Sequence, residues 1–144
     1  METLSVRVIG AGLAGSEAAL QLASFGFKVE LYEMRPGKQT PAHKGGNLAQ
    51  LVCSNSFKGL SLTSAHGLLK NELKMLGSFL LQIAEKTSVP AGESLTVNRD
   101  LFSEEVEKLI LSTPNITLHR EEVQSLEGNL PTIVAAGPLA SDTL

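Results

Sequence analysis

The sequence predicts an α/β fold in which a parallel β-sheet and its helices form three layers. A short apolar run at residues 6–9 leads into a glycine-rich turn and then into helix-forming residues at 14–25. A second apolar run follows at 28–32, and a third at 132–138 ends in a glycine turn. Strand, helix and strand in this order form a βαβ unit with parallel strands. The pattern is typical of a Rossmann-like domain.

The turn after the first strand has the spacing of a dinucleotide-binding motif. Its three glycines form G-x-G-x-x-G. The first permits the tight turn, the second lets a pyrophosphate approach the backbone, and the third lets helix and strand pack closely. The helix N-terminus then offers N–H groups and a positive dipole end to the phosphates. The candidate nucleotide-binding residues of this turn are Gly10, Ala11, Gly12, Leu13, Ala14 and Gly15.

Glu33 ends the second predicted strand, at the distance along the chain where a carboxylate accepts hydrogen bonds from an adenosine ribose. Strand, glycine turn, helix, second strand and terminal acid together make the motif much more specific than the glycines alone. Two alternatives remain open from these residues. The turn could hold no ligand, or the domain could belong to an NAD-dependent dehydrogenase.

The middle of the chain is predicted to contain an irregular functional segment and a helix. Residues 34–67 hold prolines, glycines and many small polar residues without a clear period. Such a segment inside a compact domain is usually functional or disordered. Apolar residues then recur at helical spacing through 69–83, which predicts one amphipathic helix packed on the core.

The last third of the chain is predicted to return to strands after one more helix. Asp100 can cap a helix over 101–111. Strands are predicted at 94–97, 116–119 and 123–126, and a buried parallel strand at 132–138. A solvated face of the helix is predicted for Glu104, Glu105, Glu107 and Lys108. Little sequence follows the last strand, so we interpret the chain as the front part of something larger.

Composition narrows the possible functions. The chain has 144 residues, of which 42% are hydrophobic and 19% charged, which fits one globular domain. The net charge of −3 argues against nucleic-acid binding by the chain as a whole. No apolar stretch is long enough for a membrane span, and no secretory signal precedes the first strand. With a single cysteine, these features predict a cytoplasmic protein that does not associate with membranes.

Two short segments within 34–67 carry candidate chemistry. Cys53 could act as a nucleophile if its thiolate is accessible, but from spacing alone a buried structural cysteine is the favoured interpretation. Residues 40–43 could form a loop that closes over a cofactor, or an ordinary surface turn. One cysteine and three scattered histidines do not predict a metal site.

Four segments together resemble a known family. They are GAGLAGSE at 10–17, LYEMRP at 31–36, TPAH at 40–43 and LVCSNS at 51–56. The chain resembles the folate/FAD-dependent tRNA (uracil-5-)-methyltransferases, which are relatives of the GidA flavoproteins. The resemblance extends over the whole chain, and the short matches are specific to this family rather than to flavoproteins at large.

The resemblance implies an FAD-binding Rossmann domain of the glutathione-reductase type. It implies that FAD is bound by the glycine turn with Glu33, Arg35 and Gly137. It further implies C5 methylation of a T-loop uridine in tRNA, with methylenetetrahydrofolate as the carbon donor and NAD(P)H as the reductant. Uracil C5 becomes nucleophilic once a thiolate adds at C6, which favours Cys53 as a catalytic residue.

The chain also departs from the family pattern. Family members are much longer, so residues 1–144 are interpreted as the N-terminal part of the FAD-binding domain, truncated before most of the tRNA surface. Ala136, Glu93, Asn98 and Lys58 stand where the family usually has other residues. We therefore expect this chain alone to be inactive and to bind nucleic acid weakly or not at all. The alternative is a truncated FAD-binding module without catalytic activity.

Overall fold

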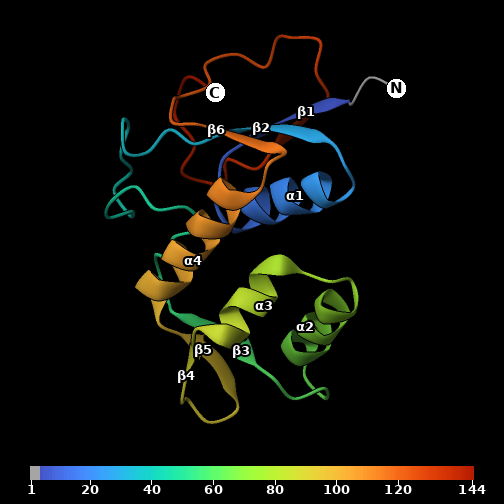
Figure 1. The fold of residues 1–144 in the computed structure, drawn as a ribbon. Helices are drawn as coiled ribbons and strands as arrows, with labels where there is room; N and C mark the ends of the chain where they lie inside the picture. The colour runs from blue at the N-terminus through green and yellow to red at the C-terminus, as the bar shows by residue number, and fades with distance from the viewer. Residues whose placement is uncertain (1–3) are drawn as a thin grey trace.

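The computed structural model describes residues 4–144 and places their strands in two sheets (Figure 1). The larger sheet is parallel, with the order β6-β2-β1-β7, and the smaller is antiparallel, with the order β3-β5-β4. The strands of the parallel sheet are β1 (Ser5–Ile9), β2 (Lys28–Tyr32), β6 (Ile116–His119) and β7 (Thr132–Val134). Those of the antiparallel sheet are β3 (Ser56–Gly59), β4 (Ser88–Val89) and β5 (Ser94–Val97). The helices are α1 (Leu13–Ser24), α2 (Ala65–Met75), α3 (Phe79–Lys86) and α4 (Arg99–Ser112).

The predicted βαβ unit is confirmed. β1 and β2 are parallel neighbours, with Val8 opposite Leu31, and both side chains are fully buried. These two residues belong to the same buried cluster as the inner residues of α1, so they lie on the face of the sheet that α1 covers. The three predicted strands at 28–32, 94–97 and 116–119 are found at these residues.

Helices cover one face of the parallel sheet, and the chain between β6 and β7 covers the other. α1 contacts β1 and β2, while α4 contacts β6 (Figure 1). On the opposite face, Arg7 of β1 donates hydrogen bonds to the carbonyl oxygens of Leu126, at 2.8 Å, and Glu127. The third layer is therefore irregular chain. The strand predicted at 123–126 is wrong, because Arg7 rather than a neighbouring strand binds this backbone.

β7 is parallel as predicted but is neither as long nor as buried as the sequence suggests. It pairs with β1, placing Val134 opposite Ile9. Ile133 and Val134 are 39% and 53% exposed, since β7 is an edge strand and none of the helices in residues 4–144 packs on it. The strand ends at Val134, residues 135–137 have neither helix nor strand, and a turn follows at 138–139.

The single helix predicted over 69–83 is wrong. Gly77, with φ +76°, follows the end of α2, and α3 starts two residues later. Glu17 of α1 accepts the Ser78 hydroxyl at 3.0 Å and the N–H groups of Phe79 and Leu80, so a new helix begins there. Of these two helices, only α3 packs on the core. Leu80 and Ile83 are buried, whereas exposed apolar side chains on or beside α2 include Leu68, Leu69, Leu73, Met75 and Leu76.

The segment at 34–67 is only partly irregular, since it contains β3 and the first turn of α2. The residues without helix or strand run from 33 to 55, and within them Leu48 and Ala49 are fully buried. Asn98, rather than Asp100, caps α4 by accepting the N–H of Leu101 at 3.2 Å.

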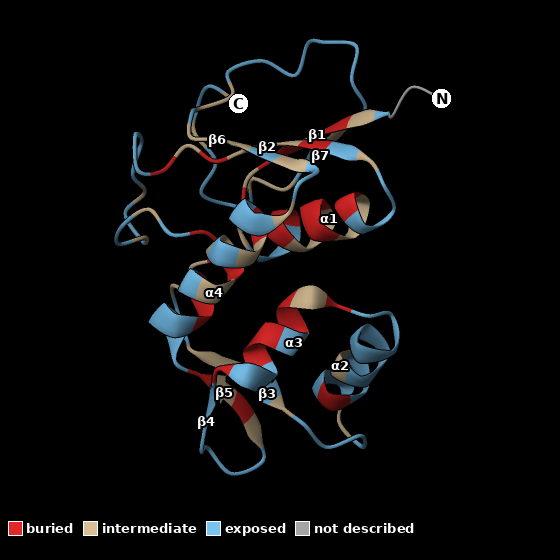
Figure 2. Cartoon of the chain, in the orientation of Figure 1, coloured by how far each residue is buried: buried red, intermediate tan, exposed pale blue. Residues whose placement is uncertain are grey.

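One hydrophobic core serves both sheets. Phe102, Val106 and Ile110 of α4 are fully buried and belong to the same cluster as the inner residues of α1 and α3 (Figure 2). None of the helices within residues 4–144 is long and apolar enough to cross a membrane.

Candidate functional site

A cavity of about 370 Å³ opens at the carboxyl ends of β1, β2 and β7. This edge is where open α/β sheets bind ligands. Among the residues predicted from the sequence, the cavity is lined by Gly10, Gly12, Leu13, Ala14, Glu33, Arg35 and Gly137. Three predicted residues, Ala11, Gly15 and Cys53, are not part of its lining.

The three glycines of the turn have different surroundings. A Cβ atom on Gly15 would lie 1.7 Å from the carbonyl oxygen of Gly10, and one on Gly10, where φ is +94°, would lie 2.6 Å from the oxygen of Ala135. A Cβ on Gly12 would meet no atom within 4 Å. Gly10 and Gly15 therefore allow close packing of the backbone, while Gly12 leaves open space beside the cavity. This division matches the roles that the motif predicts.

The N-terminus of α1 faces the cavity without a side-chain cap. Gly12 occupies the N-cap position, and the first turn contains no acidic residue. Leu13 and Ala14, the first helical residues, line the cavity. The first N–H groups of a helix have no partner within the helix and carry its positive dipole end. This arrangement suits an anionic group such as a phosphate.

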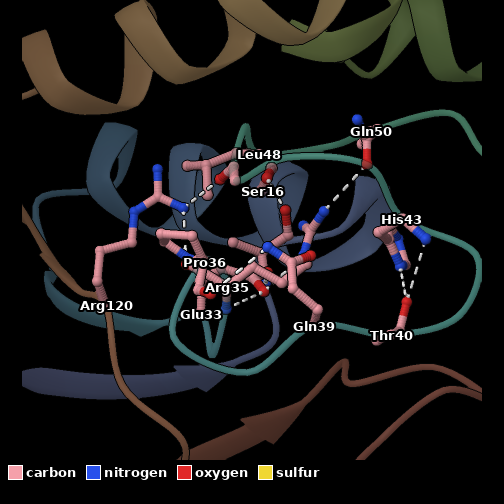
Figure 3. A network of polar contacts seen from close by, with 12 residues as sticks. Ser16, Glu33, Arg35, Pro36, Gln39, Thr40, His43, Leu48, Gln50 and Arg120 are labelled. Atoms are coloured by element: carbon pink, nitrogen blue, oxygen red, sulfur yellow. Dashed lines mark hydrogen bonds and ion pairs between the residues drawn. The ribbon is translucent and has the colours of Figure 1, made fainter.

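Glu33 lies immediately after β2 and is bonded to the glycine turn. Its Oε2 accepts the N–H of Ala11 at 3.1 Å, while Oε1 accepts the N–H and Nε of Arg35 at 3.1 and 2.9 Å (Figure 3). A carboxylate accepts about four hydrogen bonds, so one position remains for an outside donor. Burial raises the pKa of Glu33, but the hydrogen bonds and charge of Arg35 and the bond from Ala11 outweigh it, and the pKa is lowered overall.

Thr40 and His43, from the segment that could form either a cofactor loop or a surface turn, line the same cavity. Nδ1 of His43 and Oγ1 of Thr40 are hydrogen-bonded, and the same oxygen accepts the N–H of His43 at 3.2 Å (Figure 3). Burial and the charge of Arg35 lower the pKa of His43 below its usual 6.5, against the opposing effect of Glu33. The imidazole is therefore neutral at pH 7, with one ring nitrogen that donates a hydrogen bond and one that accepts.

Cys53 is exposed, and its neighbour Val52 lines the cavity. The interpretation of Cys53 as a buried structural residue is wrong. Gly137, with φ +69°, also lines the cavity, and a Cβ atom there would meet nothing within 4 Å. The structure thus brings the glycine turn, Glu33, Arg35 and the turn after β7 together.

Sequence reasoning missed two residues beside this site. Glu107, predicted on a solvated face, is half-buried and pairs with Arg120 at 2.6 Å. Both side chains also bind main-chain groups of the 33–55 segment. A main-chain group can bind a side chain whatever its residue type, so the sequence carries no signal for these two bonded residues. Across residues 4–144, no group of three or more His, Cys, Asp and Glu side chains is placed to hold a metal ion.

Comparison with protein families and curated proteins gives consistent matches. The model of the family "Glucose inhibited division protein A" matches residues 5–139. A protein of Aquifex aeolicus is 56% identical over 139 residues, which are 96% of this chain and 31% of that protein. One of Lactobacillus delbrueckii subsp. bulgaricus is 52% identical over 142 residues, or 99% of this chain and 32% of the relative. Both are named methylenetetrahydrofolate–tRNA-(uracil-5-)-methyltransferase TrmFO. The chain thus spans about a third of the length of these relatives.

Among solved structures, the fold is similar to that of Aquifex aeolicus GidA. The TM-score is 0.66 at 22% sequence identity, over 85% of this chain and 20% of that one. This likeness supports the fold independently of the sequence matches.

Proposed function

The chain belongs to the glucose inhibited division protein A family, and from this premise we propose that its cavity binds FAD. We further propose that it forms the N-terminal part of a folate/FAD-dependent tRNA (uracil-5-)-methyltransferase. The relatives at 52–56% identity carry that name. Because the chain spans about a third of their length, the activity is proposed for the longer protein, to which this chain contributes the cofactor site and Cys53.

The observation that carries the FAD proposal is the open space at Gly12 beside the uncapped N-terminus of α1. A pyrophosphate needs a close approach to the main chain and several N–H donors, and this turn offers both. Glu33 lines the same cavity and has capacity for one more hydrogen bond. These residues therefore fit the adenosine diphosphate half of a dinucleotide.

In this proposal the N–H groups of Leu13 and Ala14 bind the phosphates, and Glu33 accepts a ribose hydroxyl. Arg35 keeps Glu33 ionised and in place. Gly137 lets the turn after β7 approach the cofactor, because no side chain projects there. FAD, when bound, supplies the redox chemistry of the reaction.

Cys53 is proposed as the nucleophile toward the uracil ring. Its thiolate would form a bond from sulfur to C6, moving the electron pair of the C5–C6 bond toward the C4 oxygen as an enolate. C5 then becomes the carbon nucleophile that receives the one-carbon unit. The exposed position of Cys53 beside a cavity-lining residue supports this role. The carbon donor methylenetetrahydrofolate, NAD(P)H as the reductant, tRNA as the substrate and a cytoplasmic location belong to the same proposal.

Titration of the purified chain with FAD tests the cofactor assignment. We expect quenching of flavin fluorescence and a protein-bound visible spectrum, with NAD failing to displace the flavin. Displacement of FAD by NAD at similar concentration would favour the dehydrogenase alternative. A chain that binds neither would contradict the proposal.

A further inference from the structure

Glu107 and Arg120 form an ion pair beside the irregular loop of residues 33–55. Nη2 of Arg120 lies 2.6 Å from Oε1 of Glu107, and the side chains are 29% and 22% exposed. Oε2 of Glu107 accepts the N–H of Leu48 at 3.0 Å. α4 and the residue after β6 therefore place opposite charges against the same loop.

Arg120 holds this loop through two carbonyl groups. Its Nη1 donates to the oxygens of Arg35, at 3.1 Å, and Gly46 (Figure 3). One guanidinium nitrogen carries two hydrogens, so it can serve both acceptors. The planar group fixes the two carbonyls relative to each other, which the flexible point charge of a lysine does not.

The other side of the loop is bonded to the glycine turn. The N–H of Ala49 donates to the carbonyl oxygen of Ala11 at 2.9 Å, and the hydroxyl of Ser103 donates to the oxygen of Leu48. Ala49 has a φ of +49°, a left-handed conformation that an L-residue adopts at a cost. The surrounding contacts must therefore hold the loop in this shape.

We propose that Glu107 and Arg120 are positioning residues for the FAD site. Together they press residues 44–50 against the glycine turn and fix the main chain of Arg35, which in turn orients Glu33. Neither side chain lines the cofactor cavity, so both act through the loop. This inference rests on the proposed function. Loss of Arg120 frees the carbonyls of Arg35 and Gly46, and loss of the Glu107 charge weakens its bonds to the N–H of Leu48 and to Arg120. In either case the loop opens more often and FAD binds less tightly.

The test compares Glu107→Gln and Arg120→Gln with two controls. Glu105→Gln also removes a charge from α4. In the described residues, the carboxylate of Glu105 is paired with the exposed Lys108, at 3.6 Å. Ile110→Val lowers global stability from the buried side of α4, and its apolar side chain makes no hydrogen bond to the loop. For each variant, amide hydrogen exchange at Leu48 and Ala49 and the affinity for added FAD are measured well below the unfolding temperature.

We expect exchange at Leu48 and Ala49 to be about tenfold faster in the two test variants. FAD binding should be about tenfold weaker, which corresponds to the loss of one charge-assisted hydrogen bond. Arg120→Lys should restore neither, because an ammonium group cannot reproduce the planar fork. Both controls should keep the exchange and the affinity of the unaltered chain.

Unchanged exchange in the test variants would overturn the inference, as would faster exchange with unchanged FAD affinity. An equal loss of affinity in Ile110→Val would also overturn it, since the effect would then follow from stability alone. If the unaltered chain binds no FAD, the proposed function itself fails. That outcome differs from the failure of the positioning role, in which the unaltered chain binds FAD and the variants bind it equally well.

Discussion

The N–H of Ala11 donates to Oε2 of Glu33 across 3.1 Å, so the glycine turn and the acid after β2 are bonded directly to each other. Two parts of the dinucleotide motif that lie far apart in the sequence form one polar unit. The nitrogens of Arg35 bind the other carboxylate oxygen and complete this unit. The ionised state of Glu33 therefore contributes to stability, and in the proposed function it also contributes to cofactor binding.

Stability should fall in acid partly because of Glu33. Its pKa in the folded chain lies below the ordinary 4.5, so its contribution is fully present above pH 4.5 and is lost as the pH falls through the folded value. Glu33→Gln should remove this part of the pH dependence. Unfolding by urea at a series of pH values between 3 and 7, in about one-unit steps, measures it. Parallel curves for both proteins below pH 4.5 would contradict the prediction.

Gly12 and Gly15 should separate binding from folding. Gly12→Val should keep the fold but weaken FAD binding by about a hundredfold, since its side chain would occupy the space of a phosphate. Gly15→Ala should instead lower the free energy of unfolding by about 2–3 kcal/mol, because its Cβ would lie 1.7 Å from the Gly10 oxygen.

Gly59→Val is the matched control for these two variants, because a Cβ at Gly59 meets only the Ser64 hydroxyl, at 3.8 Å. Thermal unfolding and FAD titration of the three proteins give both quantities. Retention of FAD by Gly12→Val with unchanged affinity would refute the assignment of the phosphate site.

Cys53→Ala should leave stability within about 0.5 kcal/mol, because the side chain is exposed. FAD binding should also persist. In a full-length protein that contains this segment, methylation of tRNA should fall sharply, since the thiolate proposed to add to C6 is gone. Activity of the alanine variant close to that of the parent would exclude Cys53 as the nucleophile.

The chain alone should bind tRNA weakly and should not methylate it. Its net charge is −3, and phosphate binding needs clustered cations. Lys38 is paired at 2.6 Å with Glu122, which lines the cavity. Hydrogen bonds from Lys38, Ser141 and Thr143 lower the pKa of Glu122 to about 2, so the acid stays charged at neutral pH.

A titration with tRNA at physiological salt, repeated at higher salt, provides the measurement. Any residual binding should fade as salt rises, because it depends on released counterions. Tight, salt-resistant binding would show that residues 1–144 carry a nucleic-acid surface. Methylation after addition of the folate donor and a reductant would show a complete active site.

The local parts of the fold could be predicted from the sequence. β1, α1 and β2 were predictable because the apolar periods, the glycines and the terminal acid all act within one short stretch. The split of α2 from α3 was not, since it depends on Glu17 binding Phe79 and Leu80 from another helix. The irregular third layer likewise depends on Arg7 reaching the carbonyls of Leu126 and Glu127.

The candidate site divides in the same way. Six of the seven predicted lining residues lie near the turn or just after β2, where the motif fixes their spacing. The exposure of Cys53 depends on how residues 33–55 cross the edge of the sheet, which no local pattern sets. The Glu107–Arg120 pair binds main-chain groups. Every residue type has such groups, so the residue types of the partners do not predict these bonds.

The burial of Leu48 and Ala49 affects the entropy of the irregular loop at 33–55. The entropic cost of holding the two ends of a loop together grows with the length of the loop. Anchoring at 48–49 divides the irregular chain into two shorter spans, 34–47 and 50–55, each with its own fixed ends. Each span is shorter than the whole segment, so fixing its ends costs less entropy than closing one unanchored loop of the full length.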